Sequence, residues 1–222
     1  MNFKLLKALM AISIFSTTLP AMANLITNGS FEDNIVGNGS WAWFSASDVN
    51  GWGGSNIEIW HNYSNFSAAK GSQLAELNAH PSSGSAFSIF QTFNTTANTL
   101  YDLSFFYSAR SNNNEAFQLS LHASDNTEIF SQLIDDHEVR NWSYFSNSFS
   151  AISKTTTLRF TSVYPESGTV GNFLDDIKVF ASANNIAQPV TDVPEPSALF
   201  LAGFGLLIVI RKKIKTKLIQ SN

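Results

Sequence analysis

The chain has 222 residues, of which 44% are hydrophobic and 14% charged, a composition that supports a folded core and excludes an intrinsically disordered protein. It contains no cysteine, which excludes disulfides, zinc–thiolate sites, iron–sulfur clusters and thiol nucleophiles. The net charge of −4 is unevenly distributed: residues 24–182 carry six basic and fifteen acidic side chains, a balance of −9. Such a surface repels phosphate groups, so nucleic acid is excluded as a partner.

Residues 1–23 have the pattern of a secretory signal peptide. The segment has a basic start with Lys4 and Lys7 and an apolar stretch at residues 5–15. Ala21-Met22-Ala23 places small residues, Ala21 and Ala23, at the two positions that signal peptidase recognises. We therefore expect signal peptidase to cleave after Ala23 and export the rest of the chain. The alternative is an uncleaved membrane anchor, for which the apolar stretch is short.

Residues 24–182 predict one all-β domain. Apolar residues recur with a period of two between turn-forming Gly, Asn and Ser clusters, and no helical period is sustained. Strands are predicted at 56–60, 73–77, 86–93, 101–107, 117–121, 142–149, 157–163 and 173–180. Eight or nine short strands in about 160 residues favour a two-sheet antiparallel β-sandwich, with a jelly roll as the favoured topology, because a single open sheet would leave one apolar face in water.

After residue 182 the composition changes three times. A linker of small and polar residues at 183–192 is followed by Val193 and by Pro194-Glu195-Pro196. Residues 197–210 are uncharged and almost wholly apolar, and residues 211–217 are basic. A helix over the apolar part rises about 21 Å, less than the roughly 30 Å hydrocarbon core. We therefore expect a short transmembrane helix that holds the chain temporarily, with the basic tail in the cytoplasm.

These three parts, in this order, resemble the PEP-CTERM sorting signal of Gram-negative bacteria, at residues 193–217. Its hallmarks are a Pro-Glu-Pro tripeptide, a short hydrophobic segment and a basic tail, and Pro194, Glu195 and Pro196 match the tripeptide without a departure. The resemblance implies processing by an exosortase in bacteria that make extracellular polysaccharide. The alternative is a plain C-terminal membrane anchor.

Four short motifs lie within residues 24–182, namely NLITNGSFE at 24–32, Gly51-Trp52, GSQLAELN at 71–78 and FLDDIKV at 173–179. With these motifs the segment resembles the galactose-binding-domain-like jelly rolls, which include several carbohydrate-binding modules and related plant and bacterial domains of unknown function. The resemblance implies that the first and last strands lie together. It indicates the fold much more strongly than the ligand.

The same resemblance implies a structural Ca²⁺ ion between the opening motif and the closing strand. By position, Glu32 would supply one carboxylate and Asp175 or Asp176 the other. With Ile177 and Val179 facing the core, strand alternation turns Asp175 inward too, and a buried carboxylate needs a partner. The alternative is a carboxylate that accepts hydrogen bonds from backbone N–H groups.

Several tryptophans lie in turn-rich sequence, where core packing does not obviously require them. Sugar recognition combines a flat aromatic face with short polar side chains. On this basis the candidate ligand-binding residues are Trp52, Trp60, His61, Tyr63, Arg110 and Asn112. The alternative for the tryptophans is that they fill the ends of the sandwich.

The sequence carries no strong signal for catalysis. It contains neither Gly-x-Ser-x-Gly nor a glycine-rich phosphate loop, and no two of its four histidines are spaced i, i+4. Glu58, Glu76 and Glu115 could supply the two carboxylates of a glycosidase, but any acidic β-protein offers such pairs. The charged run at 135–138 lacks the ligand spacing of a metal loop and predicts a solvated loop.

Together these features predict a non-catalytic protein exported across the inner membrane of a Gram-negative bacterium to the envelope surface or extracellular matrix. Signal peptidase and exosortase would process it, the membrane would hold it transiently, and polysaccharide of the envelope or biofilm would be its ligand. Two alternatives stay open: a structural surface protein with protein contacts only, and a polysaccharide hydrolase or lyase.

Overall fold

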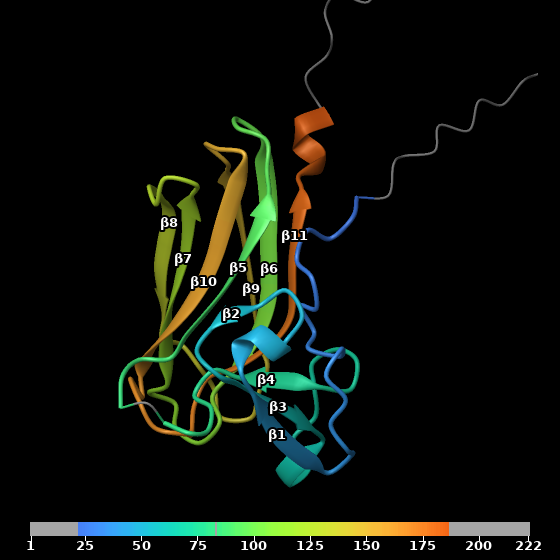
Figure 1. Cartoon of the computed structure of the whole chain (residues 1–222), viewed down its shortest axis with the longest axis vertical. Coiled ribbons are helices and arrows are strands. Elements are labelled where there is room, and N and C mark those ends of the chain that lie inside the picture. The colour runs from blue at the N-terminus through green and yellow to red at the C-terminus, as the bar shows by residue number, and fades with distance from the viewer. Residues whose placement is uncertain (1–21, 83, 187–222) are drawn as a thin grey trace, which may run out of the picture. The chain divides into compact units, whose positions relative to one another are not determined.

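The computed structural model describes residues 22–82 and 84–186, and the chain divides into two compact units, Met1–Ser182 and Ala183–Asn222. The described part of the first unit is an all-β sandwich of two antiparallel sheets (Figure 1). The described part of the second unit is the 3₁₀ turn η3 (Ala183–Ile186). The predicted two-sheet fold class is therefore confirmed.

The two sheets have six and five strands. In spatial order, the larger contains β1 (Ser40–Phe44), β3 (Ile57–His61), β4 (Leu74–Glu76), β11 (Phe173–Ala181), β6 (Leu100–Ser108) and β9 (Ser143–Ser150). The smaller contains β2 (Gly53–Gly54), β5 (Ser88–Asn94), β10 (Thr155–Tyr164), β7 (Ala116–Ala123) and β8 (Glu128–Ile134). Two 3₁₀ turns, η1 (Ala46–Asp48) and η2 (Tyr63–Asn65), lie in the connections. All eight predicted strands are present; β1, β2 and β8 were not predicted.

Phenylalanine side chains fill the space between the sheets. Along β6 every second residue is buried, as the period-two pattern requires. The ring of Phe105 lies 4.7 Å from that of Phe145 in its own sheet, and 5.1 and 6.0 Å from Phe160 and Phe117 of the opposite sheet. Large flat rings suit a gap of roughly 10 Å between sheets.

The N-terminal segment lies beside the last strand. The backbone N–H of Leu25 donates to the carbonyl of Val179 at 2.8 Å, and that of Ile177 donates to the carbonyl of Gly29 at 3.0 Å. The Asn24 side chain accepts a hydrogen bond from the N–H of Val179 at 2.9 Å. The first and last segments of the domain are therefore neighbours, as the resemblance implies.

Strand pairing defines two ends of the sandwich. Ser108 pairs with Phe173 and Tyr101 pairs with Ala181 across β6 and β11. The loops at 109–115 and 165–172 consequently lie at one end, which we call the loop end. The chain leaves the last strand at the other end (Figure 1).

Several predicted features fall outside the described residues. They are Ala21 and most of the signal peptide, the tripeptide Pro194-Glu195-Pro196, the apolar segment at 197–210 and the basic tail at 211–217. Within residues 22–82 and 84–186, no helix is long and apolar enough to cross a membrane.

Candidate functional site

A buried carboxylate, Glu115, organises the turn at the loop end. Its two oxygens accept hydrogen bonds from the backbone N–H groups of Arg110, Ser111, Asn112 and Asn172 at 2.7 to 3.0 Å. The Ser111 hydroxyl adds a further bond at 3.2 Å. A carboxylate that accepts so many N–H groups fixes the local backbone, so this turn is held rigidly against the start of β11.

Arg110 extends from this turn over the larger sheet. Its Nη1 donates to both carboxylate oxygens of Glu76 at 2.8 Å and lies 4.0 Å from Oε1 of Glu58. Glu58 and Glu76 are directly opposite each other on β3 and β4, and both are buried. Burial raises the pKa of Glu76 well above its ordinary value, although Arg110 opposes the shift. The guanidinium of Arg110 is thus the shared ion-pair partner of two buried carboxylates.

An aromatic cluster surrounds this ion pair. The guanidinium carbon of Arg110 lies 4.7 Å from the ring centre of Trp60, a cation–π contact. Trp60 in turn contacts Tyr63 and Phe173 edge-on, each at 4.9 Å. Trp41 and Trp142 are partly buried against the same cluster. The indole N–H of Trp60 donates to Glu58 at 2.8 Å, so the ring is held on both its face and its edge.

An open pocket of about 230 Å³ lies beside the Glu115 turn. We call it the loop-end pocket; its lining residues are Ser111, Asn112, Glu115, Tyr164, Pro165 and Val170. Tyr164 and Val170 are 49% and 38% exposed. The pocket therefore offers an accessible aromatic ring, a hydroxyl and an amide on a rigid backbone.

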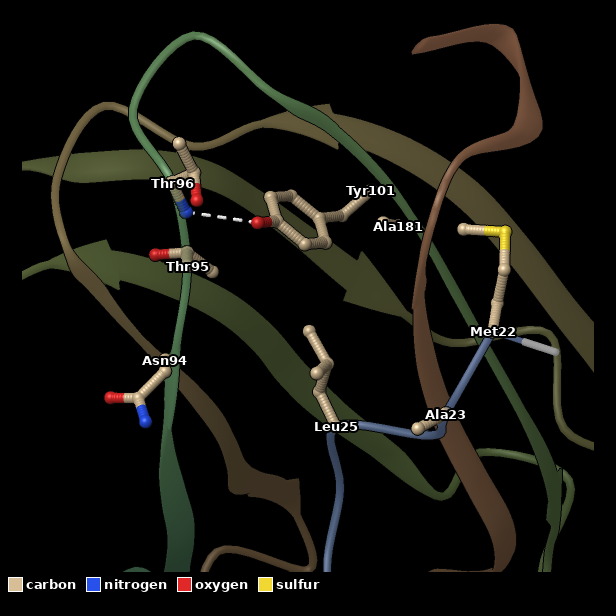
Figure 2. Close-up of a pocket in the computed structure, with 8 residues that line it drawn as sticks. All are labelled: Met22, Ala23, Leu25, Asn94, Thr95, Thr96, Tyr101 and Ala181. Atoms are coloured by element: carbon tan, nitrogen blue, oxygen red, sulfur yellow. Dashed lines mark hydrogen bonds between the residues drawn. The ribbon is translucent and has the colours of Figure 1, made fainter. Parts of the chain in front are cut away.

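Figure 2 shows another pocket, of about 350 Å³, at the end where the chain leaves the sandwich. Leu25, Tyr101 and Ala181 contribute to its lining, and the Tyr101 hydroxyl accepts a hydrogen bond from the N–H of Thr96 at 2.9 Å. Met22 and Ala23 also line it. Because the expected signal peptidase cleavage would remove these two residues, the loop-end pocket is the better candidate for a ligand site.

The structure brings some of the predicted ligand-binding residues together. Trp60, Tyr63 and Arg110 meet in the aromatic cluster, and Asn112 lines the adjacent pocket. His61 is held apart, with Nδ1 2.8 Å from the carbonyl of Val36. The sequence pattern does not predict that Trp60, Tyr63, Arg110 and Asn112 lie close together, because their contacts join separate strands and loops.

Trp52 and Trp60, two of the candidate ligand-binding residues, do not offer their rings to a ligand from solvent. They are only 5% and 1% exposed. Trp52 stacks on Phe31 at 5.3 Å inside the main core, and its indole N–H donates to the carbonyl of Asn28 at 3.2 Å. Trp52 therefore fills the main core, whereas Trp60 packs in a separate cluster of buried residues with Phe66, Leu74 and Phe173.

Backbone N–H groups and a lysine bind the three carboxylates considered for Ca²⁺. Glu32 accepts hydrogen bonds from the N–H groups of residues 72 and 73 at 2.6 and 2.9 Å. The two oxygens of Asp175 accept from the N–H groups of Lys70 and Asp176, at 2.9 and 2.6 Å. Asp176 pairs with Lys178 at 2.7 Å.

Among the described residues, no three acidic, histidine or cysteine side chains are grouped to hold a metal ion. The carboxylates as placed fit the backbone-binding alternative better than a metal site. Calcium dependence stays a prediction, which a melting experiment tests below.

Sequence reasoning missed two parts of the site. The pairing of Glu58 with Glu76 follows from the β3–β4 register, which the alternating pattern does not specify. Tyr164 and Val170 flank a loop without periodicity. The signal that could have indicated the site is the concentration of glycine, asparagine and proline around residue 165, which is typical of binding loops.

Comparison with known proteins identifies two family matches. Residues 24–180 match the family model described as protein of unknown function (DUF642). Residues 192–213 match the PEP-CTERM protein-sorting motif, which confirms that prediction. A search of curated proteins found no significant match.

Among solved structures, the chain is similar to TmCBM61 in complex with beta-1,4-galactotriose: 15% identity over 72% of this chain and 99% of that chain, with a TM-score of 0.47. A family 16 carbohydrate binding module is 17% identical over 70% of this chain and 99% of that chain, with a TM-score of 0.47. The enzymatically active domain of tailspike protein 4 of bacteriophage CBA120 is 14% identical over 72% of this chain and 21% of that chain, with a TM-score of 0.48. Similarity at this level does not extend to function.

Proposed function

This chain belongs to the DUF642 family and carries a PEP-CTERM sorting motif, and we propose that it is an exported surface protein that binds polysaccharide through the loop-end pocket. Its setting would be the envelope surface or biofilm matrix of a Gram-negative bacterium. The observation that carries the proposal is the pocket itself. It combines an exposed tyrosine ring with a serine and an asparagine on a backbone that Glu115 holds in place.

These groups suit a sugar. A tyrosine face packs on the C–H groups of a pyranose ring, while short hydroxyl and amide side chains exchange hydrogen bonds with its hydroxyl groups. Asn112 uses its side-chain oxygen to accept the N–H of Asn114 at 2.9 Å, which orients its amide nitrogen. A rigid site lowers the entropy cost of binding.

The course of the chain supports this role. The last strand, β11, begins at the loop end and finishes at the opposite end, from which the chain continues towards the sorting motif. The pocket thus lies at the end of the sandwich opposite to the end of β11.

We propose binding rather than catalysis because the three carboxylates considered for a glycosidase, Glu58, Glu76 and Glu115, are occupied. Glu115 accepts hydrogen bonds from four backbone N–H groups. Glu58 and Glu76 are closed to solvent at 1% and 0% exposure and share Arg110. A glycosidase needs two carboxylates that flank an accessible glycosidic bond.

Binding is tested by retention of the purified full chain on a glycan array or polysaccharide affinity gel. Tyr164→Ala removes the proposed stacking ring, and we expect at least a tenfold loss of affinity. Trp43→Ala is the matched control, since Trp43 is similarly exposed at 47% and lies on β1, outside the pocket lining. Absence of retention on any glycan would favour the structural alternative, with protein contacts only.

Processing by signal peptidase and exosortase is tested separately in the bacterium. Replacing Pro194, Glu195 and Pro196 by alanine should leave an unprocessed form in the membrane, detected by its higher mass. Normal maturation of this variant would contradict exosortase processing.

A further inference from the structure

A polar groove opens on the side of the sandwich, and none of its lining residues lines the loop-end pocket. It lies between β8 and β9, which are edge strands of different sheets and do not pair with each other. Its volume is about 460 Å³. We call it the β8–β9 groove; its lining residues are Tyr107, Gln132, Leu133, Ile134, Asp135, Asp136, Tyr144, Phe145, Ser146 and Asn147.

The groove carries negative charge without a counter-ion. Asp135 and Asp136 line it, and none of its lining residues is basic. Within the described residues, the basic side chains in ion pairs are Arg110, which pairs with Glu58 and Glu76, and Lys178, which pairs with Asp176. Neither Asp135 nor Asp136 is therefore in an ion pair. The Tyr107 hydroxyl donates to Oδ1 of Asp136 at 2.7 Å. This bond fixes one oxygen of the Asp136 carboxylate.

An exposed aromatic ring accompanies the two carboxylates. Tyr144 is 59% exposed, and its ring is supported by Phe106 at a centroid distance of 4.9 Å. Gln132, Ser146 and Asn147 add amide and hydroxyl groups to the lining. The groove therefore combines an anionic centre, a stacking surface and neutral hydrogen-bonding groups.

A buried histidine packs against Tyr107, one of the lining residues. His137 follows Asp136, is only 3% exposed and contacts the Tyr107 ring edge-on at 5.0 Å. Neither of its ring nitrogens has a hydrogen-bond partner among the described residues. Its ring also contacts Phe117 edge-on at 5.2 Å and is not part of the groove lining, so the missing hydrogen bonds are a cost of burial to the folded chain.

We propose that the β8–β9 groove binds a protonated amino sugar, with its ammonium group between Asp135 and Asp136 and its ring on Tyr144. Carboxylates and aromatic faces both attract an ammonium group, whereas a neutral sugar can only donate hydroxyl hydrogen bonds to the two carboxylates and has no charge to pair with them. The balance of −9 over residues 24–182 adds a general attraction for cationic polymers and repels acidic ones. This inference rests on the proposed polysaccharide binding and assigns it a second site and a sugar class.

The test is isothermal titration of the full chain with a glucosamine hexamer at mildly acidic pH, where the amines are protonated. The N-acetylglucosamine hexamer is the neutral control. We expect the glucosamine hexamer to bind at least tenfold more tightly. The double variant Asp135→Asn/Asp136→Asn should remove this preference, and Tyr144→Ala should weaken binding at least tenfold. Asparagine at position 136 can still accept the hydrogen bond of the Tyr107 hydroxyl, so we expect the double variant to fold. Its melting temperature, compared with that of the wild type, verifies this.

Two controls exclude simpler explanations. Asp125→Asn removes one negative charge from the exposed turn before β8, where its side chain accepts the N–H of Thr127, and it should leave binding unchanged. An equal loss in this variant would indicate non-specific charge attraction and overturn the site. Displacement of the glucosamine hexamer by oligolysine at equal concentration would overturn the assignment to a sugar.

The two binding proposals fail differently. If the chain retains neutral glycans in a manner that depends on Tyr164 but does not prefer glucosamine, the groove assignment is wrong and the loop-end pocket stands. If no glycan of either kind binds, both proposals are wrong.

Discussion

His137 makes the stability of the domain sensitive to acid. Burial lowers the pKa of this imidazole to about 4, although Glu115, Asp136 and Asp135 oppose the shift. The folded pKa is below the unfolded one, so the stabilisation is present at neutral pH and is lost as the pH falls from about 6.5 towards 4. The charged run at 135–138 was expected to be a solvated loop; Asp135, Asp136 and Glu138 are exposed, but His137 is not.

We expect His137→Phe to reduce this acid sensitivity, because phenylalanine fits between the rings of Tyr107 and Phe117 and does not titrate. Between pH 7 and pH 5 the wild type should lose about 2 kcal/mol more of its free energy of unfolding than the variant does. Urea denaturation at both pH values measures this difference. Equal losses in the two proteins would contradict the argument.

Arg110 is the residue whose loss should harm the site most. Arg110→Met leaves Glu58 and Glu76 enclosed without their cation, and we expect the free energy of unfolding to fall by about 3–5 kcal/mol. Adding Glu76→Gln removes one of the stranded charges and should restore part of that loss. The double variant distinguishes a charge effect from the loss of packing on Trp60, since only the charge effect is rescued.

At the scale of elements, the contact of the N-terminal segment with β11 depends on Gly29. A Cβ atom there would lie 2.1 Å from the carbonyl oxygen of Ile177, a contact that the backbone must move to avoid. Gly29→Ala should therefore lower the free energy of unfolding by about 2 kcal/mol or more. Gly37→Ala is the matched control, since its Cβ would have no atom within 4 Å. Equal stability of the two variants in urea would contradict the close approach.

The pairing register of β11 shifts between Asp175 and Lys178. Asp175, one of the carboxylates considered for a Ca²⁺ ion, lies at this shift. Burial raises the pKa of Asp175 to about 7, although N–H groups of the backbone oppose the shift. The folded pKa exceeds the unfolded one, so this contribution to stability is full below about pH 4 and is lost as the pH rises through 7.

A cation bound at Asp175 would compensate the ionised form. We therefore predict that Ca²⁺ raises the melting temperature relative to a chelator, and does so more at about pH 8 than at pH 5, because a ligand of the folded state stabilises it by mass action. Identical melting curves with Ca²⁺ and with chelator would remove the calcium prediction.

The strands that the sequence pattern missed lie at sheet edges, although the edge strand β9 was predicted. The three strands that the sequence pattern did not reveal, β1, β2 and β8, are all at sheet edges. In β8 only Ile134 is fully buried, so the alternation of polar and apolar residues is weak. Interior strands such as β6 and β10 have neighbours on both sides, and their alternation was clear.

At the scale of the whole molecule, the sequence indicated the fold, the C-terminal sorting motif and the neighbouring first and last segments. It did not indicate the site, because the loop-end pocket joins residues 111–115 with residues 164–170 and the ion pair joins Arg110 with Glu76. Such contacts depend on strand order, which a period-two pattern does not encode. Trp52 was misplaced because its turn-rich surroundings conceal a core position.

The central claim is that glycan binds at the loop end. Hydrogen–deuterium exchange of the full chain, with and without a polysaccharide that it retains, tests this most directly. The account predicts slower exchange at backbone amides of residues 109–116 and 164–172 when the glycan is present, and no change around the pocket of Figure 2. Unchanged exchange at both loop segments, with protection elsewhere, would contradict it.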